Sequence, residues 1–350
     1  MLKTVEVPLA GHPDKICDQI VDALVDEYLR RDPKSLVDIQ AMGGNGMVMI
    51  AGTVDSKADF DCAKIVRDVY ASIGYEDEIE PFVNIESPSE DMAKVLVKGG
   101  AQGTTVVYGY ASKETREFLP RAYVYANAIA KRLDDLRKMD KTFSWLRPDG
   151  KVQLTMDGNT PVAVTVMAQH DPKLDLTHIQ MQLVNAVIIP VLGEHSGVKL
   201  LVNSGGIFGE GGFSTHAGAS GRKVQADTYG GLLPSSDFGL SGKDPRKPSR
   251  AGTYMARYAA KSLVAQGVAG NVLISVAYGM GQPDPIFIEA HSGKGEDLSD
   301  IVKAQFDFRP EAIVERLDLA NPIYGKVSTY GQFGRDGLPW ESIDKQEEVG

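Results

Sequence analysis

The stretch LVDIQAMGGNGMVMIAGTV (residues 36–54) contains two strand-like runs, LVDIQA and GMVMIAGTV. In the residues that follow, their period-two pattern gives way to apolar residues three and four positions apart, as at Ile65, Val69 and Ile73. The first spacing is typical of β-strands and the second of an amphipathic helix. We therefore predict two strands followed by a helix within residues 55–73.

The same order of two strands and a helix occurs twice more. Strand-like runs cover 151–156 and 162–169, then 271–280 and 285–291, with helices expected within 170–192 and 292–306. Because each unit must bury an apolar face, three like units predict an α+β fold of three similar domains, each a small sheet with helices packed on one face. The corresponding domain boundaries are 1–105, 106–205 and 206–350, and these domains are expected to be interlaced.

Two further helices are predicted at residues 13–31 and at roughly 121–138, the first with Ile16, Ile20 and Leu24 on one face. Helices favour Ser, Thr, Asp or Asn immediately before their first turn. Candidate caps for the helices of the three repeats are Ser56, then Asp175 or Thr177, then Ser299.

The composition describes an ordinary globular chain and excludes some partners. The 350 residues are 43% hydrophobic and 24% charged, with a net charge of −10. This charge argues against binding nucleic acid or an anionic membrane surface. No run of 18 apolar residues occurs, so we expect no membrane span. The two cysteines, Cys17 and Cys62, are expected to be reduced and buried, which favours a cytoplasmic location.

The stretch LAGHPDKICDQ (residues 9–19) places charged and polar groups at a helix start. Pro13 suits the first helical position, which leaves His12 as the cap and Asp14 in the first turn. A helix N-terminus attracts anions, and here His12 could donate to a phosphate oxygen while Asp14 could hold a bridging Mg²⁺. A well-capped helix, with Asp14 favouring the helix dipole, explains the same residues.

A second group of residues, in glycine-bearing loops, also points to a polyanion. Between Ser220 and Lys261 there are eight basic and three acidic residues, a net charge of +5. Such loops let the backbone approach a ligand closely, and this suits a polyphosphate. The loops match neither a P-loop nor a dinucleotide-binding pattern. A solvated basic surface is the alternative.

Several motifs together resemble the methionine adenosyltransferase family. They are GHPDK (11–15), YGYA (108–111), RPDGK (147–151), SGRK with DTYGG (220–231), SGKDP (241–245) and PIYGKVSTYGQFGR (322–335). Their order and spacing follow the family from near residue 5 to about residue 341. The resemblance implies synthesis of S-adenosylmethionine from ATP and L-methionine, with release and hydrolysis of tripolyphosphate, and dependence on Mg²⁺ and K⁺. It also implies sites built between two subunits, hence a homodimer or homotetramer.

The resemblance further implies roles for individual residues. His12 would contact the phosphate at the breaking bond, and Asp14 would bind Mg²⁺. The phosphates would lie among Lys151, Arg222, Lys223 and Lys243, which with His12 form the expected catalytic set. Asp149 and Phe208 would contact the nucleotide, Phe208 lying against the adenine. Lys247 would lie near both ATP and methionine.

The chain departs from the family at six site positions. A glutamate for K⁺ is replaced by Gln40, a methionine-binding glutamate by Thr53, and aspartates by Ala101, His216 and Ser249, whereas Ile207 replaces an arginine. Five of these changes remove a carboxylate, so the expected amino-acid contacts at Thr53 and His216 and the K⁺ contact at Gln40 are altered. Candidate replacement acids are Glu210, Asp227, Asp237 and Asp244.

These departures leave two other functions open. The chain could transfer adenosyl to a different nucleophile or only cleave tripolyphosphate, or it could be a non-catalytic ATP-binding regulator. Retention of His12, Asp14 and the phosphate-binding cations argues against a pure regulator. The segment 87–104, which ends in the glycine cluster GGAQG, is expected to gate the site.

Overall fold

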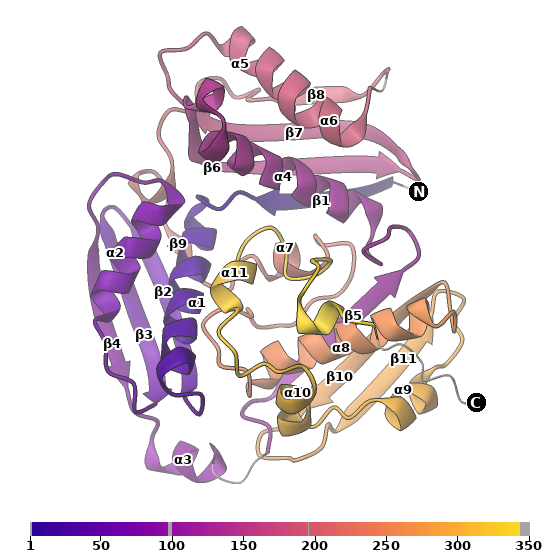
Figure 1. Ribbon diagram of the computed structural model, residues 1–350. Coiled ribbons are helices and arrows are strands. Elements are labelled where there is room, and N and C mark those ends of the chain that lie inside the picture. The colour runs from indigo at the N-terminus through magenta and orange to yellow at the C-terminus, as the bar shows by residue number, and fades with distance from the viewer. Residues whose placement is uncertain (1, 97–99, 195, 344–350) are drawn as a thin grey trace.

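The protein is described by a computed structural model that covers residues 2–96, 100–194 and 196–343. Three small sheets form its framework (Figure 1). The first has the order β1-β6-β7-β8 and contains β1 (Leu2–Pro8), β6 (Leu146–Asp157), β7 (Thr160–His170) and β8 (Lys199–Val202). The second has the order β4-β3-β2-β9 and contains β2 (Leu36–Gly44), β3 (Met47–Asp55), β4 (Glu80–Glu86) and β9 (Gly218–Ala219). The third has the order β11-β10-β5 and contains β5 (Thr105–Ser112), β10 (Asn271–Tyr278) and β11 (Phe287–Ser292).

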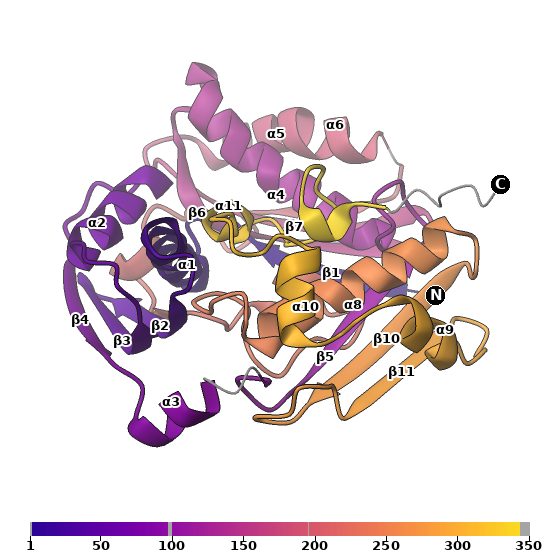
Figure 2. The same ribbon diagram turned by 60° about the horizontal axis from the view of Figure 1, so that its bottom comes forward.

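One long helix packs against each sheet. Helix α1 (Pro13–Arg31) contacts β2, α4 (Arg121–Met139) contacts β1 and β6, and α8 (Pro248–Ala265) contacts β5 and β10. Figures 1 and 2 show this repeated pairing of a long helix with a sheet. The structure therefore confirms the predicted α+β fold of small sheets with helices on one face.

The sheets are interlaced along the chain. Strand β1 pairs with β6, β5 pairs with β10, and β9 pairs with β2, so each sheet takes strands from distant segments. Most pairs are antiparallel, but β3/β4 and β7/β8 are parallel. The core at the helix–sheet contacts is tight: a Cβ added to Gly109 on β5 would lie 2.0 Å from a backbone atom of Ala256 on α8.

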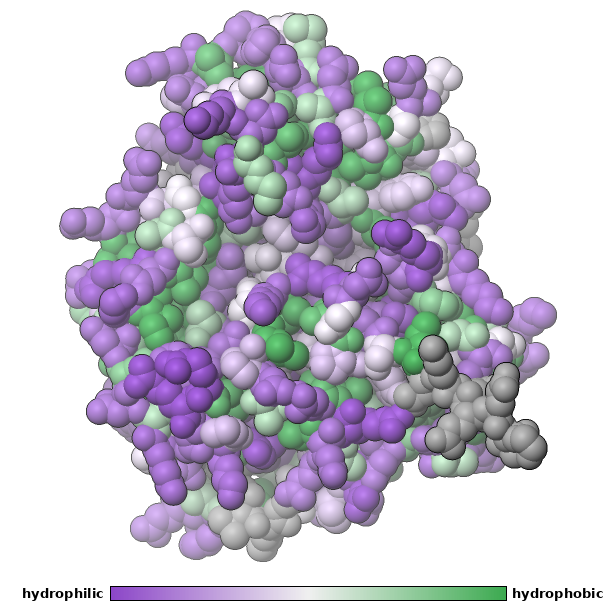
Figure 3. Space-filling model, in the orientation of Figure 1, coloured by the Kyte–Doolittle hydropathy of each residue, from purple (hydrophilic) through white to green (hydrophobic). Residues whose placement is uncertain are grey.

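Shorter helices complete the fold. They are α2 (Cys62–Ile73), α3 (Glu90–Leu96), α5 (Leu176–Leu183), α6 (Ile189–Leu192), α7 (Val224–Thr228), α9 (Ser299–Gln305), α10 (Pro310–Arg316) and α11 (Tyr324–Val327), with a π-helical turn at Val184–Ile188. Within the described ranges, no helix is both long and apolar enough to cross a membrane. On the face seen in Figure 3, hydrophilic side chains predominate, with small hydrophobic groups between them.

The predicted strands and helices are found close to their expected positions, and two predicted caps are wrong. Asp175 caps α5, as predicted. Helix α2 begins after Asp61 rather than Ser56, because the Asp61 carboxylate accepts the Lys64 N–H while Ser56 bonds to Ser35 and Ala58. Ser299 is the first residue of α9, and its own N–H is bound by Asp297.

The two cysteines and the expected gate at residues 87–104 agree only in part with the sequence predictions. Cys17 is buried, but Cys62 is only partly buried. In the segment 87–104, the structure describes residues 87–96, which include α3, and residues 100–104. There the Ala101 N–H donates to the Gln282 carbonyl, and the Gly281 N–H donates to the Ala101 carbonyl. Residues 97–99 of the expected gate lie outside the described residues.

Helix α1 carries four aspartates spaced four residues apart, which we name the aspartate row: Asp14, Asp18, Asp22 and Asp26. Each accepts backbone N–H groups from residues that are distant in the sequence. Their donors are Ala219 (3.0 Å), Gly221 (2.7 Å), Gly242 (2.9 Å), and Tyr324 and Gly325 (2.9 and 2.8 Å), in that order. One helix face therefore fixes the backbone of three separate segments: β9 with the residues after it, the loop at Gly242, and the start of α11.

Buried cations balance the aspartate row. Lys15 donates to Asp18 (2.8 Å) and to Asp227 (2.6 Å), and Arg250 donates to Asp22 (2.6 Å). Burial opposes the charge of Lys15, but the two carboxylates outweigh burial and raise its pKa above the ordinary value. Arg250 also lies over the Tyr324 ring, 4.2 Å from its centroid. The row is thus a largely buried ionic network, with Asp26 partly exposed, rather than a solvated helix face.

Asp22→Asn should destabilise the protein strongly, because it leaves the fully buried Arg250 without a carboxylate. Breaking one partner of such a pair costs about 3–5 kcal/mol. Asp135→Asn is a matched control, since its pair with Lys131 on α4 is exposed and should contribute less than about 1 kcal/mol. Urea unfolding of both variants tests this, and similar losses from the two would contradict it.

Candidate active site

The N-terminus of α1 is capped as its sequence predicts. Pro13 is the first helical residue, and the His12 Nδ1 atom accepts the Asp14 N–H at 3.2 Å. The loop that leads into β9 lies directly against this turn, because a Cβ added to Gly218 would lie 2.2 Å from the Pro13 carbonyl carbon. The helix end and the glycine-rich loop are therefore one unit.

A cavity of about 350 Å³, which we name the histidine pocket, opens at this unit. It is lined by His12, Pro13, Asp14, Asp149, Gly150, Lys151, Met167, Phe208, Thr215, His216, Ala217, Arg222 and Lys223. Eight of these are residues that the sequence predicts for the site: His12, Asp14, Asp149, Lys151, Phe208, His216, Arg222 and Lys223. They come from α1, the β6–β7 hairpin and the loop around β9.

His12 is a neutral hydrogen-bond donor toward this pocket. Burial and the positive charge of Lys223 lower the pKa of His12 to about 3. Because Nδ1 accepts the Asp14 N–H, the single ring proton of the neutral imidazole must be on Nε2. The ring can therefore donate to an oxygen without carrying a charge.

Asp14 is the ionised centre of the pocket. It accepts from Lys223 Nζ at 2.6 Å, and Arg222 lies 3.4 Å away. Burial opposes ionisation, but the bonds from Lys223 and from the Ala219 N–H hold the pKa of Asp14 below its usual range. Without a ligand, Asp14 therefore neutralises cations that a phosphate could otherwise engage.

Asp149 lies deeper in the same pocket. Its Oδ2 accepts the Gly212 N–H at 2.8 Å, and its own N–H is bound by Gln169. Burial raises the pKa of Asp149 to about 6, although the Gly212 N–H favours the carboxylate. Asp149 is thus the one acid here whose charge changes near neutral pH, and it also interacts electrostatically with His216.

A second cavity of about 230 Å³, which we name the lysine pocket, lies beside β2. It is lined by Asp38, Gln40, Gln102, Gly103, Thr104, Thr105, Phe238, Lys243, Lys247, Pro248 and Ser249. The loop that carries both lysines is held along β2 by two backbone bonds: the Ile39 N–H donates to the Gly242 carbonyl, and the Asp244 N–H donates to the Val37 carbonyl. Lys247 Nζ lies 3.0 Å from the Asp38 carboxylate.

Lys243 is the most perturbed base of this pocket. Burial lowers the pKa of Lys243 to about 8, and the charges of Arg250 and Lys247 act in the same direction, whereas Asp38 opposes them. Its ammonium donates to the Gly239 carbonyl and lies 5.2 Å from the Phe238 ring centroid. A phosphate beside Lys243 would place a negative charge next to the ammonium group and would therefore raise its pKa again.

Within one chain, the structure does not bring all predicted site residues together. The two pockets share no lining residue, so Lys243, Lys247 and Gln40 are separated from the histidine pocket. Thr53 lines neither pocket, and it lies directly opposite Asp38 in the β2–β3 register.

The four candidate replacement acids have other partners or positions. Asp227 is bound to Lys15, Asp244 accepts the Val37 N–H, and Asp237 accepts the Thr105 hydroxyl. Glu210 lines neither pocket.

Sequence reasoning missed Asp38 and Gln102. Alternation along β2 places Asp38 on the same face as Gln40, which was the signal that could have found it. Gln102 lies in the GGAQG cluster, but that pattern indicated only a gate, because the place of Gln102 in the lysine pocket comes from tertiary contacts.

A bound metal would rely on few protein ligands. Among the described residues, no group of three or more His, Cys, Asp or Glu side chains is placed to hold a metal ion. Mg²⁺ commonly binds through one or two carboxylates together with substrate phosphates. Asp14 fits that mode, and the Gln40 amide oxygen is a ligand that K⁺ could use.

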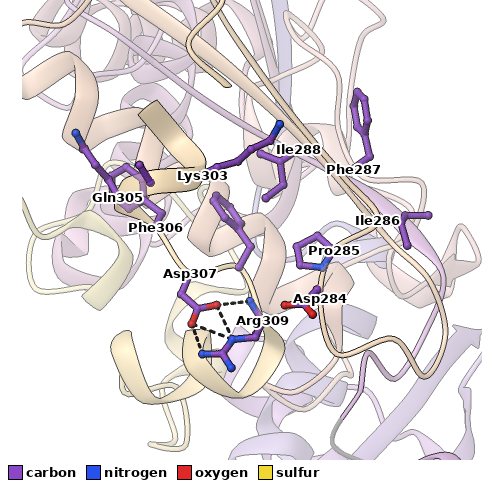
Figure 4. Close-up of a pocket in the computed structure, with 12 residues that line it drawn as sticks. Asp284, Pro285, Ile286, Phe287, Ile288, Lys303, Gln305, Phe306, Asp307 and Arg309 are labelled. Carbon is purple, nitrogen blue, oxygen red and sulfur yellow. Dashed lines mark hydrogen bonds and ion pairs between the residues drawn. The ribbon is translucent and has the colours of Figure 1, made fainter. Parts of the chain in front are cut away.

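A cavity larger than the histidine and lysine pockets lies away from all of these residues. It has a volume of about 720 Å³ and lies between residues 284–288, at the start of β11, and residues 303–309, which include the last turn of α9 (Figure 4). None of the predicted site residues lines it. Size alone therefore does not identify the site in this fold.

Comparisons with known proteins all point to one family. Models of the S-adenosylmethionine synthetase N-terminal, central and C-terminal domains match residues 1–90, 98–208 and 210–342. The chain is 37% identical to the S-adenosylmethionine synthase of Petrotoga mobilis, over 100% of this chain and 98% of that protein. It is 38% identical to that of Sorangium cellulosum (98% and 87%) and 37% identical to that of Aquifex aeolicus (99% and 98%).

Binding of inorganic tripolyphosphate should weaken above about pH 8 as the free Lys243 loses its proton. A lowered pKa means that the charge is present below pH 8 and lost above it. Lys243→Arg keeps its charge through this range, so its affinity should fall less. Calorimetry of both forms between about pH 7 and 9.5 measures this difference. Identical pH profiles would show that Lys243 does not contact the phosphates.

Proposed function

Because this chain belongs to the S-adenosylmethionine synthetase family and synthesises S-adenosylmethionine, we propose that its histidine and lysine pockets are two halves of the site for that reaction. The substrates in this proposal are ATP and L-methionine. The observation that carries it is the set of cations at both pockets: Lys151, Arg222 and Lys223 at one, Lys243 and Lys247 at the other.

The reaction requires positive charge at the leaving group. The methionine sulfur donates an electron pair to C5′ of ATP, the C5′–O5′ bond breaks, and its electrons pass to the tripolyphosphate. Fixed cations lower this barrier because they bind the oxygens more strongly as negative charge develops. Tripolyphosphate is then hydrolysed to pyrophosphate and phosphate while it is held by the same groups.

His12 serves at the breaking bond in this proposal. Its Nε2–H is the available proton, because Nδ1 is occupied by the helix cap. A neutral donor stabilises the departing oxygen through a hydrogen bond and keeps its proton ready throughout the physiological pH range. Asp149 and Phe208 would contact the nucleoside from the other side of the pocket.

Metal ions complete the charge balance when bound. When bound, Mg²⁺ would supply positive charge that neutralises part of the phosphate charge. Asp14 would hold it, since it is the ionised carboxylate beside the phosphate-binding cations. Lys223, which is paired with Asp14 in the absence of ligand, would then be released toward a phosphate. Gln40 would contribute to a K⁺ site at the lysine pocket.

We propose that a second copy of the chain joins the two half-sites. Lys151 and Met167 pair across β6 and β7, opposite the side on which Val152 and Leu154 pack into the core. Asp38 and Gln40 likewise lie on the face of β2 opposite Val37 and Ile39. Both pockets therefore open on sheet faces that the long helices leave uncovered.

The same uncovered face of the second sheet is apolar. Met42, Met49 and Phe82 lie in register across β2, β3 and β4, and their exposed fractions are 62%, 56% and 50%. A contiguous apolar patch of this kind marks an interaction surface. A symmetric dimer formed through it would cover these side chains and set one copy's histidine pocket against the other copy's lysine pocket.

The comparisons do not favour adenosyl transfer to another acceptor, tripolyphosphate cleavage alone or a regulatory role. We also propose a cytoplasmic location, where ATP is made and thiols remain reduced; both cysteines of this chain are free.

Incubation with ATP, Mg²⁺, K⁺ and L-methionine should yield S-adenosylmethionine, pyrophosphate and phosphate. Mass spectrometry of products with and without methionine tests this, with boiled protein as the control. Release of tripolyphosphate or pyrophosphate without a sulfonium product would contradict methionine as the acceptor, and binding of ATP without turnover would contradict catalysis.

Mixed dimers test whether the site is shared. Lys151→Ala and Lys243→Ala should each lower turnover by roughly 10²–10³-fold, as expected for the loss of one fixed charge. A heterodimer of the two variants, purified through two different tags, should regain about half of wild-type activity, because one of its two sites is intact. A heterodimer as inactive as its parents would place both lysines in a site within one chain.

A further inference from the structure

We propose that Asp38, Gln102 and Lys247 form the subsite that binds the α-ammonium and α-carboxylate groups of the amino-acid substrate. This inference rests on the proposed function and adds to it the residues that select an amino acid. Asp38 and Gln102 would accept from the ammonium group, and Lys247 would donate to the carboxylate.

The first observation is the ion pair between Asp38 and Lys247. Its two charged atoms are 3.0 Å apart, with the Asp38 side chain 38% exposed and the Lys247 side chain 13% exposed. The pair therefore faces the pocket instead of being sealed in the core. An α-amino acid presents its positive and negative groups on one carbon, so a neighbouring acid and base match both groups at once.

The second observation is an unsatisfied acceptor in the same cavity. Gln102 is 8% exposed, and its Oε1 atom has no hydrogen-bond partner within the described part of the chain. A buried polar atom without a partner costs free energy unless a ligand supplies one. An ammonium group has three donors, which can serve both Gln102 and Asp38.

The charge pattern around Asp38 suits a zwitterion, while Lys243 of the same pocket is left to bind the phosphates. Asp38 places a carboxylate among the pocket's cations, where it would repel phosphate oxygens. In the histidine pocket, by contrast, Asp14 is bound to Lys223 and Asp149 is bound to the Gly212 N–H. Asp38 is also paired, with Lys247, but it is 38% exposed, whereas Asp14 and Asp149 are buried. Asp38 is therefore the acid most accessible to an incoming ammonium group.

The remaining wall of the lysine pocket suits a thioether side chain. Phe238 lines it with a ring that is 51% exposed, and Pro248 adds an apolar surface. Sulfur makes favourable contacts with aromatic rings. A methionine anchored at Asp38 and Lys247 could thus lay its side chain along Phe238.

The position of Asp38 also accounts for the missing acid at residue 53. Asp38 and Thr53 are direct partners in the β2–β3 register, so their side chains project from the same face. Side chains at such positions have Cβ atoms about 4.5–5.5 Å apart. A carboxylate at residue 38 or at residue 53 can therefore reach the same α-ammonium group. In this chain the carboxylate is at residue 38.

Binding of radiolabelled L-methionine in the presence of inorganic tripolyphosphate and Mg²⁺, measured by equilibrium dialysis, tests the subsite without requiring turnover. Asp38→Asn should weaken methionine binding at least about tenfold, the loss of roughly one charged hydrogen bond. Asp55→Asn is the matched control, since Asp55 lies on the same sheet and lines neither pocket. The double variant Asp38→Thr/Thr53→Glu should recover most of the lost affinity.

A second readout separates ammonium binding from mere positioning of Lys247. If Asp38 only positioned Lys247, Asp38→Asn would raise the KM for ATP as much as that for methionine, and this result would overturn the inference. The expected result is a raised KM for methionine with an ATP KM within about twofold. The wild-type protein should prefer methionine to the analogue that lacks the α-amino group, and Asp38→Asn should lose this preference.

The two failures are distinguishable. Equal methionine binding by the wild type and Asp38→Asn overturns the subsite while leaving the proposed function intact. Wild-type protein that binds methionine but forms no sulfonium product overturns the proposed function instead.

Discussion

The hydrogen bonds from the aspartate row of α1 to the glycine-rich loops are the constraint on which the site depends. Loops without regular secondary structure need external partners for their backbone N–H groups. Here Asp14 and Asp18 hold the loop that carries Arg222 and Lys223, and Asp22 holds the loop that carries Lys243. One helix thereby positions cations that belong to two different pockets.

Burying the aspartate row costs free energy, but it holds the loops in one geometry. Buried carboxylates lose hydration, and the pairs with Lys15 and Arg250 compensate for that loss without making the network a large net source of stability. What the network supplies is a fixed geometry, because each charge has one set of partners. Preorganised charges of this kind lower a barrier more than mobile surface lysines would.

Much of the fold could be predicted from local pattern, and much of the site could not. Apolar residues at every second position identified the strand pairs, and apolar residues four positions apart identified α1. His12 and Pro13 identified the start of that helix. The aspartate row is visible as a four-residue spacing, but its partners lie about 200 to 300 residues away, so no local rule identifies them. The resemblance implied a site between two subunits, but it did not assign residues to each pocket, because motif order says nothing about which copy of the chain supplies each residue. Asp38 was missed for a related reason: its importance comes from its register with Thr53 and from the loop that brings Lys247 beside it.

The most direct test of this account is a crystal structure of the protein with S-adenosylmethionine and tripolyphosphate bound. The account predicts phosphate oxygens held by Lys151, Arg222 and Lys223 of one copy and by Lys243 of its partner, with the α-ammonium group at Asp38. The loops should remain bound to Asp14, Asp18 and Asp22 of α1. A complex in which one chain supplies all the phosphate contacts, or in which the loops leave the aspartate row, would contradict it.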